Sequence, residues 1–150
     1  MAVYTTPGPA ALAAFLADYA LGPCLALTPI RDGIENSNFF LDTAGARHVL
    51  TLFESASVAE LPWFLDLMDF LGQRGLPCTH PRPRRDRGFL GQLCGKPAAL
   101  FARMHGRALN RPSAAECAAL GEVLARLHLA ARLDRDDRVN GQGVARFTTT

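Results

Sequence analysis

The sequence predicts an α+β fold in which a five-stranded antiparallel sheet packs against helices. Short apolar or β-branched runs separated by glycine-containing turns predict the strands. Apolar residues that recur at three and four positions predict the helices around them. A chain of 150 residues has the size of one ordinary domain and is long enough to bury a core.

The first half of the chain predicts one helix, three strands and a second helix. After Pro9, the residues Leu12, Phe15, Leu16 and Tyr19 share one helical face. Strands are expected over 25–30, 38–43 and 48–53, because Gly33 and Gly45 with polar neighbours separate them. A second helix is predicted to begin between Ser57 and Pro62 and to end at Gly75.

The second half of the chain is predicted to form two more strands and one long helix. Apolar segments at 89–93 and 98–101 complete the sheet, with Lys96 in the turn between them. Ser113 and Glu116 have the spacing of a capping box, so a helix is expected from there to Arg132. The segment 134–150 has no apolar period and is expected to be a disordered tail.

The composition gives no reason to expect nucleic acid, a membrane or zinc as a partner. The 16 basic and 14 acidic residues leave a net charge of +2 without a basic stripe, which gives no reason to expect nucleic acid. No signal peptide or membrane-spanning apolar run is recognisable, so we expect a cytoplasmic protein without a membrane partner. The four cysteines are far apart and are expected to be free thiols, and Cys78 with His80 lacks the second pair that a zinc site needs.

The order of the predicted elements is that of a protein-kinase-like N-terminal lobe passing into a second lobe. The expected boundaries are a nucleotide-binding lobe at 1–103, a connector at 104–112, the first helix of a C-terminal lobe at 113–133, and the tail. Such a lobe binds nucleotide between a glycine-containing hairpin, a side chain of the third strand and the connector. Gly33 and its Asn and Ser neighbours suit the hairpin, although an ordinary turn explains them equally well.

Five segments resemble homoserine kinase of the aminoglycoside-phosphotransferase-like superfamily in order and in spacing. They are G-I-E-N-S-N-F-F-L at 33–41, H-V-L-T-L-F-E at 48–54, E-L-P-W-F-L-D-L-M at 60–68, R-G-L-P-C at 74–78 and A-L-G-E-V-L-A-R-L-H-L-A at 119–130. The resemblance covers residues 1–131.

The resemblance implies transfer of the γ-phosphoryl group of ATP to L-homoserine, with Mg²⁺, as a step of threonine biosynthesis. It also implies a nucleotide site in which residues of the first hairpin cover the phosphates and residues of the connector hold adenine. The implied phosphate-side residues are Gly33, Asn36, Ser37, Asn38 and Thr51, and the adenine-side residues are Phe101, Met104, His105 and Gly106.

The chain departs from the kinase pattern in two ways. Thr51 stands where kinases commonly carry a phosphate-binding lysine, so Glu54 is expected to be solvated and neutralisation to fall to magnesium or an arginine. The H-x-D-x-x-x-x-N loop and later aspartate of the superfamily do not occur, so no catalytic or metal-binding residue is predicted and we expect no useful turnover from this chain alone.

Two other functions are compatible with the residues. The chain could belong to a kinase for choline or another amino alcohol, since the second lobe largely selects the acceptor. It could also be a noncatalytic nucleotide-binding or interaction domain. Leu120 and Leu124 on the last helix would lack their intended neighbours, which predicts self-association.

Overall fold

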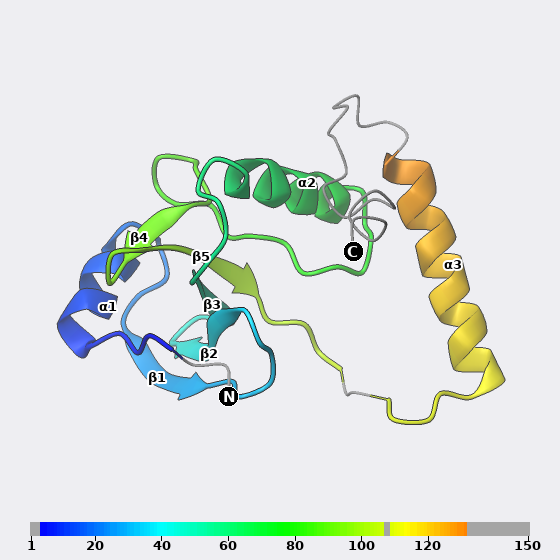
Figure 1. Ribbon diagram of the computed structural model, residues 1–150, viewed down its shortest axis with the longest axis horizontal. Helices are drawn as coiled ribbons and strands as arrows, with labels where there is room; N and C mark the ends of the chain where they lie inside the picture. Colours follow the sequence, from blue (N-terminus) through cyan, green and yellow to red (C-terminus); the bar gives the residue numbers. More distant parts are fainter. Residues whose placement is uncertain (1–3, 107–108, 132–150) are drawn as a thin grey trace, which may run out of the picture.

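The structure is a computed structural model that describes residues 4–106 and 109–131. Its elements are α1 (Pro9–Ala17), β1 (Cys24–Pro29), β2 (Asn36–Thr43), β3 (Arg47–Phe53), α2 (Leu61–Gln73), β4 (Gly91–Leu93), β5 (Lys96–Ala102) and α3 (Ala114–Ala131). The strands form one antiparallel sheet in the order β1-β2-β3-β5-β4 (Figure 1). The predicted α+β fold with a five-stranded antiparallel sheet is confirmed.

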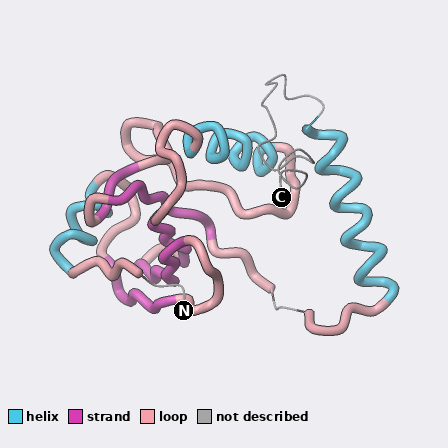
Figure 2. The backbone as a smooth tube through the Cα atoms, viewed as in Figure 1, coloured by secondary structure: helices cyan, strands magenta, loops and turns pink. Residues whose placement is uncertain are grey.

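The sheet lies between two helices. Side chains of successive strand residues point to opposite faces of the sheet, so each face can pack against a different helix. Leu50 on β3 and Leu100 on β5 belong to the core that α1 closes. Their neighbours Val49 and Phe101 belong to a second core, which packs against Leu65 of α2. The tube in Figure 2 shows the sheet with α1 and α2 beside it. The two faces of the sheet therefore have different surroundings, and only the α2 face carries the site described below.

The strands lie within two or three residues of their predicted positions, with one informative difference. The turn between β4 and β5 is the two-residue pair Cys94 and Gly95, with φ of 53° and 72°. Two consecutive positive φ angles are typical of the tight hairpin turn that matches the twist of a sheet. Lys96 is consequently the first residue of β5, paired with Leu93, and the prediction that it lies in a turn is wrong.

The helix starts agree with the predictions. α2 begins at Leu61 with Pro62 in its first turn, where a missing N–H costs nothing. Before α3, Ser113 Oγ accepts from the Glu116 N–H at 3.3 Å, and a Glu116 carboxylate oxygen accepts from the Ser113 N–H at 2.8 Å. This pair is the predicted capping box. Arg132, where the helix was expected to end, and the tail predicted at 134–150 lie outside the described residues.

α3 stands away from the sheet and contacts the rest of the described chain near its C-terminal end (Figure 1). Leu127 and Ala130 pack near Leu71 and Leu76, and an Arg126 N–H donates to the Gly75 carbonyl at 3.1 Å. Leu120 and Leu124, which the sequence predicts to lack their intended neighbours, are exposed, as is Cys117 on the same helix. The self-association expected from the sequence stays a prediction.

His48 on β3 predicts a pH dependence of stability. Its side chain is fully buried, and burial together with the charge of Arg82 lowers its pKa from the ordinary value of 6.5, against a smaller opposing effect of Asp42. The unfolded chain therefore takes up a proton near pH 6.5 that the folded chain resists, so acidification below this pH lowers stability.

We expect the His48→Leu variant to lose less thermal stability than the parent chain between pH 7 and pH 5. Neither ring nitrogen of His48 has a hydrogen-bond partner within the described ranges, so leucine removes no such bond. Thermal unfolding followed by circular dichroism measures the difference. The exposed His105→Leu is the control, and equal acid loss in all three proteins would contradict this account.

Candidate functional site

A cavity of about 570 Å³ opens on the α2 face of the sheet, a size in the usual range of small-molecule sites. Phe40 of β2, Val49 of β3 and Phe101 of β5 form apolar walls. Met68 reaches it from α2, and the chain after β5 closes one side. Alternation along the strands selects these residues, because they share the face that also carries Asn38 and Thr51.

The polar end of the cavity is formed by a cross-strand pair. Asn38 and Thr51 lie directly opposite each other on β2 and β3, and the Thr51 hydroxyl donates to the Asn38 side-chain oxygen at 2.8 Å. This bond orients the amide and leaves its NH₂ group without a protein acceptor among the described residues. The pair therefore presents two N–H donors that could bind an anionic oxygen.

The other end of the cavity is formed by the chain that leaves β5. The Arg103 guanidinium lies over the Phe40 ring at 4.0 Å from its centre, and the Arg103 N–H donates to the Arg47 carbonyl at 3.3 Å. Met104 and Gly106 line the cavity, and the backbone groups of 104–106 have no hydrogen-bond partner within the described chain. This segment can offer main-chain donors and acceptors to a planar ligand.

The structure brings together most of the predicted site residues, but not all. The residues that line the cavity are Asn36, Asn38, Thr51, Phe101, Met104 and Gly106. Gly33, in the loop before β2 with φ of 119°, and His105 are not among them. Ser37 is fully buried on the α1 face of β2, so its side chain points away from the cavity.

Sequence reasoning missed five lining residues, namely Phe40, Val49, Phe53, Met68 and Thr79. Phe40 and Val49 are two positions from Asn38 and Thr51, so the period of a strand was a usable signal. Met68 packs on the α2-side core and also lines the cavity.

Glu54 is paired, which corrects the expectation that it is solvated. A Lys96 Nζ lies 3.3 Å from one carboxylate oxygen of Glu54, and the Ser37 hydroxyl donates to the other at 2.6 Å. Burial raises the pKa of Glu54, but hydrogen bonds from Ser37, Thr5 and Lys96 together with the lysine charge outweigh it and lower the pKa overall. Neither Glu54 nor Lys96 lines the cavity.

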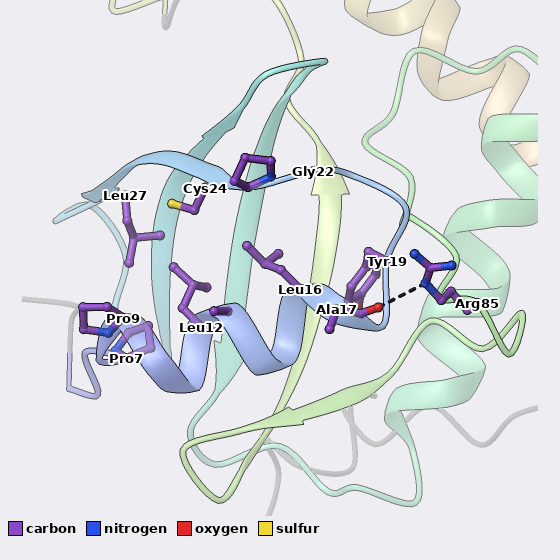
Figure 3. Close-up of a pocket in the computed structure, with 12 residues that line it drawn as sticks. Pro7, Pro9, Leu12, Leu16, Ala17, Tyr19, Gly22, Cys24, Leu27 and Arg85 are labelled. Carbon is purple, nitrogen blue, oxygen red and sulfur yellow. Dashed lines mark hydrogen bonds between the residues drawn. The ribbon is translucent and has the colours of Figure 1, made fainter.

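A second cavity, of about 680 Å³, lies between α1 and β1 (Figure 3). Leu12, Leu16 and Leu27 point into it, and at its far end Arg85 Nε donates to the Ala17 carbonyl at 3.1 Å. Its lining is mainly apolar and lacks a pair of oriented polar groups like Asn38 and Thr51. We therefore take the cavity on the α2 face as the candidate site.

Two features are absent from the described residues. Within 4–106 and 109–131, no group of three or more His, Cys, Asp or Glu side chains is placed to hold a metal ion. No helix in these ranges has the length and apolarity that a membrane crossing requires.

A sheet covered by helices, with a cavity between two strands and the chain leaving β5, is the arrangement expected of the first lobe of a phosphotransferase. Residues 26–146 match the phosphotransferase enzyme family, and the chain belongs to that family.

Homoserine kinases are among the curated proteins to which this chain is similar. The enzyme of Methylobacillus flagellatus is 49% identical over 130 residues, covering 87% of this chain and 41% of that protein. The enzyme of Methylocella silvestris is 49% identical over 141 residues, covering 93% and 44%, and that of Burkholderia cenocepacia is 46% identical over 132 residues, covering 88% and 40%. The resemblance inferred from the sequence is confirmed, and the chain spans about two fifths of the length of these relatives.

Proposed function

We propose that the chain is the nucleotide-binding part of a homoserine kinase, which transfers the γ-phosphoryl group of ATP to the side-chain hydroxyl of L-homoserine. The observation that carries the proposal is the 46 to 49% identity to homoserine kinases across nearly nine tenths of the chain or more. Membership of the phosphotransferase family supports the use of a phosphoryl donor.

The apolar part of the cavity suits the adenine ring. Phe40, Val49 and Phe101 supply walls for an aromatic base. The backbone groups of 104–106, which have no partner among the described residues, can form hydrogen bonds with the edge of the base. Arg103, stacked on Phe40, holds that ring in place as one wall.

The polar part of the cavity suits phosphate. The Asn38 amide, oriented by Thr51, offers its N–H groups, and Asn36 lies next to the loop that contains Gly33. Catalysis of phosphoryl transfer rests mainly on positioning and on stabilisation of charge. The described residues supply positioning, whereas Arg103 is the one cationic side chain that they contribute to the cavity, and it lies at the adenine end.

Mg²⁺, when bound, would neutralise phosphate charge. Its participation is proposed on the resemblance alone. The role assigned to this part of the chain is to bind and orient the nucleotide, while acceptor binding is assigned to the second lobe.

A chimera tests whether this chain can serve as the nucleotide-binding part of a homoserine kinase. The chain is joined through its α3 helix to the remaining part of the Methylobacillus flagellatus relative, and phosphorylation of L-homoserine and of choline is measured. We expect kcat/KM for homoserine to exceed that for choline by at least about tenfold. The remaining part alone is the control for background activity. Phosphorylation of homoserine no faster than with the remaining part alone would refute the proposed function, and an inactive chimera that fails to bind ADP would refute the nucleotide role.

A further inference from the structure

The segment before α1 is attached to the sheet through one buried hydroxyl. The backbone N–H groups of Tyr4 and Thr5 donate to Ser37 Oγ at 2.8 and 3.0 Å. The same hydroxyl donates to a Glu54 carboxylate oxygen at 2.6 Å. Ser37 is fully buried, and its hydroxyl makes three hydrogen bonds, two as acceptor and one as donor.

The Glu54 carboxylate that accepts from Ser37 is itself held in place by Lys96. Its second carboxylate oxygen lies 3.3 Å from Lys96 Nζ, and the Lys96 ammonium also reaches the Glu54 carbonyl at 3.5 Å. The Glu54 side chain is only 12% exposed, so the ion pair holds the carboxylate that orients the Ser37 hydroxyl. Three segments distant in sequence are therefore linked through Ser37 and Glu54, namely the N-terminal segment, the residue after β3 and the start of β5.

The N-terminal segment also reaches the loop between β1 and β2. The Tyr4 hydroxyl donates to the Ile34 carbonyl at 2.9 Å. Among the hydrogen bonds of the described residues, it is the one that reaches 31–35 from another part of the chain. Ile34 is 82% exposed, so side-chain burial contributes little to holding this loop.

The loop at 31–35 leads directly into the candidate site. Asn36 and Asn38 line the cavity from one face of β2, while Ser37 between them faces the N-terminal segment. Movement of the loop relative to β2 would therefore move backbone groups beside the polar end of the cavity. A loop that is already held loses less conformational freedom when a ligand binds.

We propose that Tyr4 and Ser37 are positioning residues, which fasten the loop at 31–35 beside the polar end of the cavity and so favour nucleotide binding. The inference rests on the proposed function for the identity of the ligand. Tyr4 holds the loop directly, and Ser37 holds the segment that carries Tyr4.

The test measures the hydrogen exchange of the loop and the binding of ADP in separate experiments. Hydrogen exchange of the backbone amides at 31–36 is followed in the free chain, and ADP binding is measured by calorimetry with magnesium present. The variants are Tyr4→Phe, which removes only the hydroxyl, and Ser37→Ala, which removes the attachment. Thr43→Val is the matched control, because it removes a hydroxyl at the far end of β2 that donates to the Ala46 carbonyl at 3.0 Å and accepts from the Ala46 N–H at 3.3 Å.

We expect Tyr4→Phe to speed exchange of the loop about two- to fivefold and to weaken ADP binding by a similar factor. Ser37→Ala should have larger effects on both, and Thr43→Val should leave both unchanged. Loop exchange in Tyr4→Phe equal to that of the parent chain would overturn the positioning role. If ADP fails to slow exchange in the parent chain, the proposed nucleotide function fails, while the comparison of the free chains still decides the role of Tyr4.

Discussion

We expect the Leu50→Ala substitution to lower the free energy of unfolding by about 3–5 kcal/mol. Leu50 is 0% exposed on β3, the central strand of the sheet, and packs in the core beneath α1. Alanine would remove buried methyl groups and leave a cavity that the β-sheet backbone cannot close. Chemical denaturation with urea, followed by circular dichroism, measures the change.

Leu25→Ala is the matched control for this prediction. Leu25 carries the same side chain on β1, the edge strand, and is 66% exposed. Its replacement is expected to change the free energy of unfolding by about 0.5 kcal/mol or less. Similar losses in the two variants would show that Leu50 is not in the core that the structure assigns to it.

The second large effect is expected at Asn38. Asn38→Ala should raise the dissociation constant for ADP about tenfold or more, since hydrogen bonds to a charged group contribute about 1.5–3 kcal/mol. The substitution removes the amide at the polar end of the cavity and leaves the Thr51 hydroxyl without its acceptor. Isothermal titration calorimetry on the chain or on the chimera measures the constant.

The pairing of Asn38 with Thr51 can be tested by a double-mutant cycle. Thr51→Val alone should weaken ADP binding less than Asn38→Ala, and the double variant should lose less than the sum, because the two side chains act as a unit. Asn110→Ala, in the exposed connector outside the cavity, is the control. Full additivity would contradict the orienting role of Thr51.

Much of the fold could be predicted because the strand signals are local. Runs such as 38–43 and 48–53 combine apolar or β-branched residues with flanking turns, and each lies inside an observed strand. The capping box at Ser113 is equally local, since both partners lie within one helical turn. The site could be predicted in part for the same reason, because Asn38 and Thr51 are neighbours across one hairpin.

The remaining features depend on contacts between distant segments. Ser37 was assigned to the phosphate side with its neighbours, but which face a strand residue occupies is decided by the packing of the helices on the sheet. Lys96 and Glu54 are separated by 42 residues, and their ion pair forms only when β5 lies beside β3. Local pattern carries no information on such pairs.

Side chains of β2 are needed on both faces of the sheet, which limits where residues can be inserted or deleted in and before this strand. Along 36–43, partly exposed and buried residues alternate without interruption, with Asn38 on one side and Ser37 on the other. Deleting a single residue within the strand would exchange every later side chain between the two faces. The loop at 31–35 has no such alternation to preserve. We therefore expect natural insertions and deletions among homologues to gather in the loop and to be rare within the strand.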